Sequence, residues 1–120
     1  MYKVRFYRSR RGEAPVETYM AGMEGRHRRK VLQHLELLAQ EGPHLRRPYA
    51  DVLRGAIREL RVSLARFEHR VLYCFVKGDV VVLLHGFLKK TPAVPPQEIA
   101  TAEARMKDLH TRLQDGEVLE

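Results

Sequence analysis

The sequence predicts a small α+β domain with an N-terminal strand, a pair of helices, a three-stranded antiparallel meander and a C-terminal helix. Apolar residues recur at strand spacing in some segments and at helical spacing in others, and short turns join three of the strands. At 120 residues and 44% apolar content, the chain can bury one core but not two. Because no repeat or linker interrupts it, we expect residues 1–120 to form a single domain.

The first half of the chain begins with a strand and continues with two helices. Residues 2–8 alternate apolar and basic side chains, which is typical of a strand at or near a sheet edge. Pro15 suits the first turn of a helix, and residues 16–23 then supply one or two turns. Residues 26–40 are apolar at helical spacing, and a Gly-Pro pair ends this helix. Its apolar positions are Val31, Leu32, Leu35, Leu38 and Ala39. We expect a core containing Tyr2, Phe6, Leu35 and Leu38.

The second half reads as a loop, three strands and a helix. After a loop at residues 44–49, strands are predicted at residues 57–64, 67–77 and 80–88, with a Gly-Asp turn between the last two. Short connections indicate an antiparallel meander, and the last strand is apolar on both faces, as expected of a central strand. Residues 97–113 then form a helix. Its apolar side consists of Ile99, Ala102, Met106, Leu109 and Leu113.

Positive charge belongs to the body of the protein. The net charge is +7, from 22 Lys and Arg against 15 Asp and Glu. Residues 1–90 contain 19 cations and 9 anions, a net charge of +10, whereas residues 91–120 contain 3 cations and 6 anions, a net charge of −3. Such a charge attracts polyanions, so nucleic acid or a nucleoprotein is the leading partner, ahead of an acidic protein or an anionic membrane surface.

Other classes are excluded or disfavoured by composition. Cys74 is the only cysteine, so neither an internal disulfide nor a cysteine-based metal cluster can form. The N-terminus has no apolar run of signal-peptide length, and no segment approaches the roughly 20 apolar residues that a membrane helix needs. We therefore expect a cytoplasmic protein with no membrane partner.

Cations on the predicted strands are the main candidates for a functional site. Side chains alternate between the two faces of a strand, so Arg58 shares the face of the apolar residues, whereas Arg61 points away from the core. The pattern leaves Arg70 unassigned, because either face of its strand could be the core face. Lys89 shares the parity of His85, and Lys90 follows one step later.

Convergence of Arg61, Arg70 and one of the two lysines would create an anion-binding pocket. Mutual repulsion would favour the neutral form of the lysine and allow it to transfer protons, while the arginines would stabilise a phosphorane-like transition state. This is the chemistry of metal-free RNA cleavage, in which a 2′-hydroxyl attacks the adjacent phosphate. It requires no metal and no cofactor.

Structural explanations compete with these roles. Arg58 and Arg61 could be solvated or pair with glutamates, Arg70 could be a cross-strand partner, and the lysines could be a solubilising strand end. His85 is either a hydrogen-bonded core histidine or a catalytic group. Cys74 has no activating pattern around it.

A basic cluster opens the long helix, where cations oppose the helix dipole. Either it contacts RNA or the ribosome, together with Arg58, or it is a solvated face. The cluster consists of Arg26, Arg28, Arg29 and Lys30. His27 and His34 are seven residues apart on the same helix, but two histidines without a third ligand are a weak metal signal.

Four motifs resemble the phage-derived, Gp49-like branch of the RelE and HigB toxin superfamily. They are RELR at residues 58–61, HRVLY at 69–73, LHGFLKKT at 84–91 and PPQEIATAEARM at 95–106. The resemblance covers nearly the whole chain and is most specific in residues 55–107. It implies a RelE-like fold and a toxin of a type II toxin-antitoxin system, an endoribonuclease that cuts messenger RNA, usually on the ribosome. It also implies a cognate antitoxin, commonly a helix-turn-helix protein.

Residue by residue, the resemblance places the family's basic site residues at Arg61, Arg70 and either Lys89 or Lys90. Two features depart from the family. No tyrosine follows Tyr73, although many RelE toxins have one in the tail, and the C-terminal histidine of HigB-type sites is missing unless His85 replaces it.

The leading hypothesis is therefore a toxin that cleaves messenger RNA, neutralised by an antitoxin that binds the acidic last helix or the basic groove. Two alternatives share the fold: a catalytically weak module that binds RNA, the ribosome or a protein, and a ParE-like inhibitor of DNA gyrase.

Overall fold

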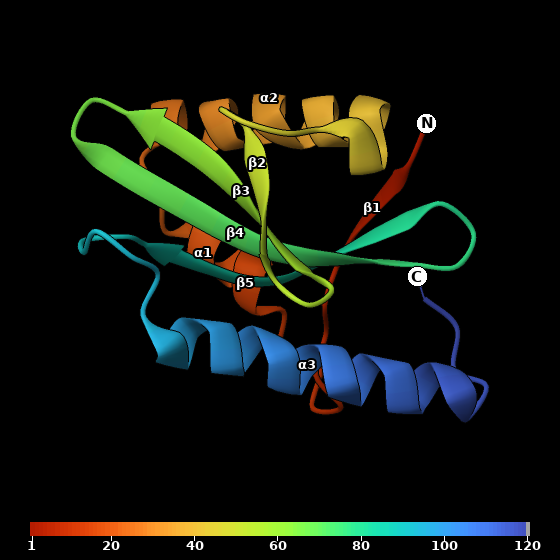
Figure 1. The fold of residues 1–120 in the computed structure, drawn as a ribbon. Coiled ribbons are helices and arrows are strands. Elements are labelled where there is room, and N and C mark those ends of the chain that lie inside the picture. The colour runs from red at the N-terminus through yellow and green to blue at the C-terminus, as the bar shows by residue number, and fades with distance from the viewer. Residues whose placement is uncertain (120) are drawn as a thin grey trace.

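One mixed five-stranded sheet lies between two helices on one face and a single long helix on the other (Figure 1). The structure, a computed structural model, describes residues 1–119. In chain order, the elements are β1 (Lys3–Phe6), α1 (Pro15–Ala21), α2 (Gly25–Glu41), a 3₁₀ turn η1 (Gly42–His44), β2 (Ala50–Arg54), β3 (Ile57–Leu64), β4 (Phe67–Val76), β5 (Val80–Leu88) and α3 (Pro96–Gln114). The α+β fold class is thus confirmed, and it matches a small RelE-like α+β domain.

The sheet has the strand order β1-β5-β4-β3-β2. Strands β2 to β5 form an antiparallel meander, and β1 joins its far side by pairing in parallel with β5. The prediction that the first strand lies at a sheet edge is confirmed. Strand β5 is flanked by β1 and β4, which explains why both of its faces are apolar.

One strand is absent from the sequence-based prediction. A meander of three strands is predicted, whereas β2 adds a fourth at the edge of the sheet, directly after the predicted loop. Strand β2, with the sequence ADVLR, shows no clear alternation of apolar and polar residues. It lies at the edge of the sheet, where Ala50 is fully buried but Val52 stays 55% exposed.

Two apolar layers hold the sheet in place. Helices α1 and α2 cover one face of the sheet. Helix α3 covers the other face, where it packs on the half of β4 that is farther from the β3–β4 turn. The first layer contains Val16, Met20, Val31, Leu35, Leu38, Leu60, Val62, Val71, Tyr73, Val81 and Leu83. The second contains Tyr7, Ile57, Leu72, Cys74, Val82, Leu84, Phe87, Ala102 and Leu109.

Two expectations about individual side chains were wrong. Leu32 was assigned to the apolar side of the long helix, but it is 47% exposed, because the stripe that meets the sheet is narrower than the spacing indicated. Tyr7 alternates with Phe6 and so shares the parity of the basic residues Lys3 and Arg5 in the predicted strand, yet it is buried and its hydroxyl donates to Asp108 at 2.6 Å. Burial raises the pKa of Tyr7 to about 12.

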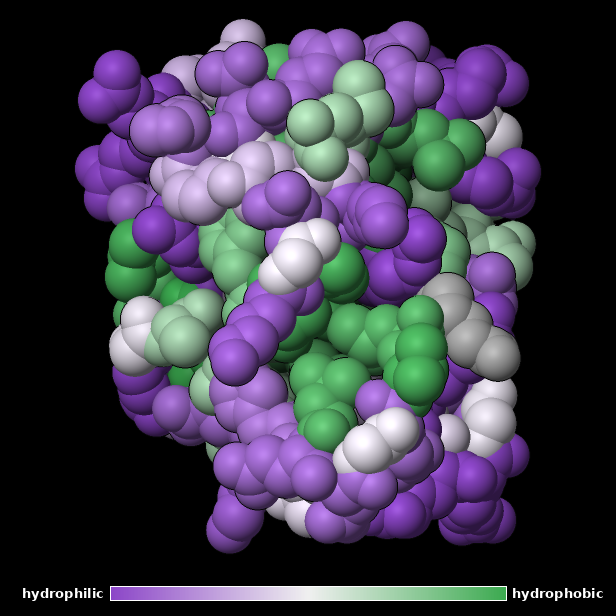
Figure 2. Space-filling model, turned by 90° about the vertical axis from the view of Figure 1, so that its right-hand side faces the viewer, coloured by the Kyte–Doolittle hydropathy of each residue, from purple (hydrophilic) through white to green (hydrophobic). Residues whose placement is uncertain are grey.

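The surface beside the two chain ends has apolar side chains gathered in its middle and surrounded by hydrophilic ones (Figure 2). Val118, in the C-terminal tail, is 84% exposed. Across residues 1–119, none of the helices combines the length and the apolar character needed to cross a membrane.

Candidate functional site

The predicted arginine pair forms on the sheet face that α3 shares. Arg61 on β3 and Arg70 on β4 are direct cross-strand partners, and Phe87 on β5 continues the same row. Residues that face each other across two strands project to the same side, so both arginines lie on one face. The alternation of residues along β4 did not show on which face Arg70 lies, whereas the pairing of β4 with β3 does.

Neighbouring rows of this face add carboxylates and a lysine. The row on one side contains Asp51, Glu59, Leu72 and His85, in the order β2 to β5. The row on the other side pairs Ser63 with Glu68, and the backbone N–H of Lys89 donates to the carbonyl of Glu68 at 2.8 Å. We call the polar part of these rows the arginine face: Asp51, Glu59, Arg61, Ser63, Glu68, Arg70 and Lys89.

Glu59 connects the two arginines. Arg61 Nε donates to Glu59 Oε1 at 2.9 Å, and Arg61 Nη2 lies 2.8 Å from the same oxygen. The second oxygen of Glu59 lies 3.6 Å from Nε of Arg70, an ion pair slightly longer than a hydrogen bond. The Glu59 side chain is only 5% exposed, so this carboxylate is held almost out of water by two guanidinium groups.

Each arginine has a further acidic partner. Arg70 Nη1 donates to Glu68 Oε1 at 3.2 Å, and the same oxygen accepts the hydroxyl of Ser63 at 2.7 Å. Arg61 Nη2 lies 3.6 Å from Asp51 Oδ2. The hydrogen bond from Ser63, followed by those from Arg70, lowers the pKa of Glu68 below its usual value. Glu68 therefore stays ionised at neutral pH.

The two arginines differ in access to solvent. The side chain of Arg61 is 31% exposed, whereas that of Arg70 is 9% exposed and also donates to the carbonyl of its neighbour His69. An incoming phosphate can therefore reach Arg61 more easily than Arg70. With Lys89 included, three cations face three carboxylates, so the arginine face is close to neutral and the repulsion among cations predicted from the sequence is offset.

Lys89 and Lys90 directly follow β5, which ends at Leu88. Lys89 Nζ donates to the carbonyl of Pro92 at 3.0 Å, which holds the ammonium beside the loop that leads to α3. Its charge also helps to lower the pKa of Glu68, which places it close to the arginine face. Lys90 is exposed, and none of the hydrogen bonds or ion pairs among residues 1–119 involves its side chain.

His85 has both ring nitrogens engaged. Nε2 lies 2.9 Å from Glu98 Oε1, and Nδ1 accepts from Arg105 Nη1 at 3.0 Å. Arginine is only a donor, so Nδ1 is the acceptor and Nε2 carries the proton that it donates to Glu98. This arrangement matches the structural alternative, in which His85 ties β5 to α3.

Arg58 lies on the opposite face from the arginine pair. It donates to the carbonyl of Pro43 at 3.3 Å, and its guanidinium carbon lies 5.6 Å from the ring centroid of Phe75. An arginine in these contacts secures the loop before β2 against the sheet.

The basic cluster at the start of α2 is divided between inward and outward contacts. Arg28 donates to the carbonyls of Met20 and Met23, and Lys30 donates to the carbonyl of Ser63. Arg26 and Arg29 are exposed, and Arg26 pairs with Glu24 at 3.4 Å. Only these two members of the cluster present their charge outward.

A buried Tyr-His-His chain is the main arrangement that the sequence analysis missed. The hydroxyl of Tyr19 lies 2.6 Å from His69 Nδ1, and His69 Nε2 lies 2.9 Å from His27 Nδ1. Burial lowers the pKa of His69 and raises that of Tyr19 to about 12. His27 was weighed with His34 as a metal ligand, but it contacts His69 instead, and His34 stands edge-on to Tyr49. Residues 1–119 contain no group of three His, Cys, Asp or Glu arranged to hold a metal.

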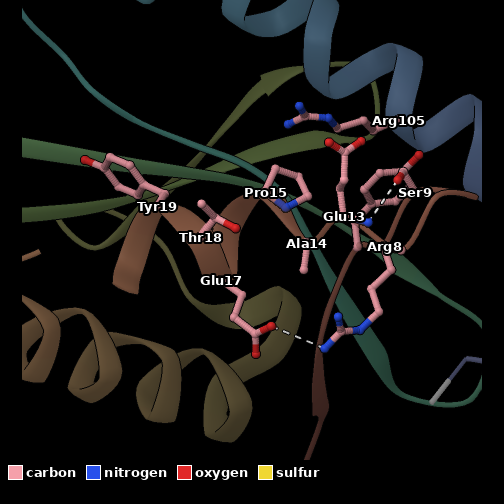
Figure 3. A pocket seen from close by; sticks show the side chains of 11 residues that line it. Arg8, Ser9, Glu13, Ala14, Pro15, Glu17, Thr18, Tyr19 and Arg105 are labelled. Atoms are coloured by element: carbon pink, nitrogen blue, oxygen red, sulfur yellow. Dashed lines mark hydrogen bonds and ion pairs between the residues drawn. The ribbon is translucent and has the colours of Figure 1, made fainter. Parts of the chain in front are cut away.

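One hollow of about 670 Å³ lies away from the arginine face, between residues 7–19 and α3 (Figure 3). Arg105 and Glu13 lie on one side of it and the ion pair of Arg8 with Glu17, 3.3 Å long, on another. None of the predicted site residues lines this hollow. Three of its charged groups have protein partners, since Arg8 pairs with Glu17 and Arg105 bonds the carbonyl of Leu84 as well as His85.

The carboxylates of the arginine face were visible in the sequence as a spacing. Glu59 precedes Arg61 by two positions, and Glu68 precedes Arg70 by two positions. Two positions along a strand return to the same face, so each glutamate had to lie beside its arginine. Pairing with glutamates was the structural alternative for Arg58 and Arg61; Arg61 pairs with Glu59, Arg58 has no ion pair among residues 1–119, and Arg70 pairs with both glutamates.

Comparison with known proteins identifies the family. The model of the family described as "Phage derived protein Gp49-like (DUF891)" matches residues 18–107, which is 90 of the 120 residues. The match includes α2, all strands of the meander and most of α3. No curated protein matches the chain. Since the matched region is three quarters of the sequence and includes the arginine face, the chain belongs to the phage-derived Gp49-like family.

Proposed function

We propose that the protein is the toxin of a type II toxin-antitoxin system and a metal-free endoribonuclease of the RelE/HigB kind that cleaves messenger RNA on the ribosome. The observation that carries the proposal is the cross-strand pair of Arg61 and Arg70, with Lys89 in the next row of the same face. Membership of the Gp49-like family supports a toxin-like module.

In the proposed reaction the 2′-oxygen of one nucleotide attacks the adjacent phosphorus. The new O2′–P bond forms as the P–O5′ bond breaks, a base takes the proton of the 2′-hydroxyl, and an acid protonates the departing 5′-oxygen. The products are a 2′,3′-cyclic phosphate and a 5′-hydroxyl. The charge of the phosphorane-like transition state needs fixed cations around it, which is the role proposed for Arg61 and Arg70.

The carboxylates give the arginines a defined resting position. Glu59 and Glu68 hold the guanidinium groups in place before RNA arrives, so less side-chain entropy is lost on binding. A phosphate at Arg61 exchanges one oxyanion partner for another. Lys89 then binds phosphate or transfers a proton, Lys90 extends the basic end of the strand, and Arg26, Arg29 and Arg58 are proposed to contact RNA outside the cleavage position.

The pairing of Arg70 favours a second candidate of a different class. A guanidinium that is 9% exposed and forms ion pairs with two carboxylates is also what a structural ion-pair network needs. The second candidate is therefore a catalytically weak module that binds RNA, the ribosome or a protein, with a ParE-like gyrase inhibitor as a variant of it.

The test is to induce the wild type and site variants in growing cells and to map the 5′ ends of messenger RNA. Arg61→Ala and Lys89→Ala should remove new 5′-hydroxyl ends and relieve growth arrest. Arg54→Ala is the matched control, because Arg54 is an exposed arginine on β2 paired with Glu103 at 3.5 Å. Growth arrest without new ends in the wild type would overturn the nuclease proposal and favour a gyrase or another binding target.

A further inference from the structure

Phe67 is a large aromatic side chain left partly open on the sheet face opposite the arginine face. It begins β4 and is 41% exposed. Two hollows, of about 500 Å³ and about 540 Å³, share Phe67 and Leu88 in their walls. The first continues toward Met23 and His27, and the second continues toward Lys89 and Lys90. We call these two adjoining hollows together the Phe67 groove.

The floor of the first hollow is made of aromatic and imidazole rings that are held in place by their contacts. His69 and His27 bond each other, and the pKa of His69 is lowered by burial and by its histidine neighbour. The ring of Tyr19 packs on Gly86 so closely that a Cβ there would lie 2.7 Å from it. The ring of His27 meets Phe67 edge-on at 4.9 Å between centroids. This part of the groove is therefore preformed and suited to an apolar side chain.

The rim of the groove has an excess of positive charge. Arg66 and Lys90 line the second hollow and are exposed, and no ion pair among residues 1–119 involves either of them. The two carboxylates nearby are already paired, Glu24 with Arg26 at 3.4 Å and Glu68 with Arg70 at 3.2 Å. A partner with carboxylates beside large apolar side chains would match this rim and floor together.

We propose that the Phe67 groove docks an acidic segment of a partner protein, whose apolar side chains pack between Met23, Phe67 and Leu88 and whose carboxylates meet Arg66 and Lys90. The inference rests on the proposed function only in naming that partner as the neutralising antitoxin. An RNA strand fits less well, because the first hollow offers no cation to a phosphate and the polar edge of a base would lose hydrogen bonds on an apolar floor.

A segment docked in this groove would contact residues of the arginine face from the opposite side of the sheet. The second hollow ends at Glu68 and Lys89, and both belong to the arginine face. A segment that fills the groove therefore covers the end of β5 while Arg61, on the other side of the sheet, stays open.

The experiment selects peptides on the purified protein from a random library of 16-residue peptides displayed on phage. A fluorescently labelled copy of the most enriched peptide then gives dissociation constants by anisotropy. We expect enriched peptides to combine Asp or Glu with Leu, Ile, Phe or Trp. Phe67→Ser should weaken binding at least about tenfold, as expected for the central contact of an interface. The double variant Arg66→Glu, Lys90→Glu should weaken it similarly and tests the rim without touching the floor.

Two matched controls accompany these variants. Leu32→Ser changes an equally exposed apolar residue on α2, and Lys107→Glu reverses an exposed charge on α3. Both should change the dissociation constant by less than about twofold. Thermal unfolding of each variant shows whether it is folded.

Three results would overturn the proposal. They are no enrichment on the wild type, an enriched peptide without acidic residues, and unchanged binding by the Phe67→Ser and charge-reversed variants. If instead a 12-nucleotide single-stranded RNA loses affinity for Phe67→Ser while the peptide does not, the groove binds a nucleobase. Peptide binding does not depend on cleavage, and cleavage in cells does not depend on the peptide, so failure of one proposal leaves the other standing.

Discussion

Replacing Glu59 by glutamine separates the two effects that its carboxylate has on the arginine pair. Glu59 is 4% exposed and lies between Arg61 and Arg70, so it both stabilises the fold and competes with any phosphate for the guanidinium groups. The isosteric amide keeps the shape and removes the charge. We therefore expect Glu59→Gln to lower stability and to strengthen RNA binding.

The size of the stability loss follows from the partners that remain. Removing one member of a buried ion pair costs about 3–5 kcal/mol, because the other charge stays buried without compensation. Arg70 keeps Glu68 at 3.2 Å, and the 31% exposed Arg61 keeps both water and Asp51. The loss should therefore lie at the lower end, about 3 kcal/mol. In a chain of this size that corresponds to a fall in Tm of about 10 °C.

The assays are thermal unfolding by circular dichroism and anisotropy of a labelled 12-nucleotide RNA at several salt concentrations. Freeing Arg61 for one more phosphate should steepen the dependence of log K on log salt by about 0.7. Glu103→Gln is the control, since Glu103 pairs with Arg54 at the surface and its loss should cost less than about 0.5 kcal/mol. An unchanged Tm would refute the account of Glu59 as a buried counter-charge. Weaker RNA binding with a correctly folded variant would refute its competition with phosphate.

Three further predictions concern the core around the site. Gly86→Ala should destabilise the protein by about 1–3 kcal/mol, since the new methyl group would meet the ring of Tyr19, whereas Gly22→Ala, with no atom nearer than 3.7 Å, should leave Tm nearly unchanged in the same thermal melts. Because the pKa of His69 in the folded protein is lowered from 6.5, the unfolded chain binds a proton at this residue more readily than the folded chain does. The unfolding free energy should therefore fall as pH drops below 6.5. In denaturant titrations, His69→Gln should flatten this pH dependence. Burial raises the pKa of Cys74 to about 12, so its thiol should react with a disulfide reagent only after unfolding, and a fast reaction of the native protein would contradict its burial.

Local patterns predicted most of the fold because each element has an apolar stripe with a clear period. The edge strand β2 was not predicted, because its five residues, with an exposed Val52, show too little alternation of apolar and polar side chains. The burial of Tyr7 was not predicted for a different reason. It depends on a hydrogen bond with Asp108, which lies 101 positions later in the chain and so outside any local pattern.

The candidate site was predictable in its residues and not in its charge balance. Strand parity separated Arg61 from the apolar face of β3, but it did not reveal that the face of Arg61 also carries an apolar layer, and Arg70 needed the register between β3 and β4. That register also brings Asp51 beside Arg61, from a strand that the sequence analysis did not find. The Tyr19, His69 and His27 chain joins three separate elements, so only tertiary structure brings it together.

The arginine face and the Phe67 groove lie on opposite faces of one sheet and meet at a single row of residues. The carboxylate of Glu68 accepts a hydrogen bond from Arg70, and Glu68 also lines the second hollow. Lys89 lines the same hollow, and its backbone N–H donates to the carbonyl of Glu68. A partner that draws Lys89 toward its own carboxylates removes a cation from beside Glu68, whose pKa Lys89 helps to lower. The negative charge of Glu68 then acts more strongly on Arg70. If both proposals hold, a partner in the groove leaves Arg61 uncovered, and partner binding and RNA binding would be coupled through this row of charges instead of competing for one surface.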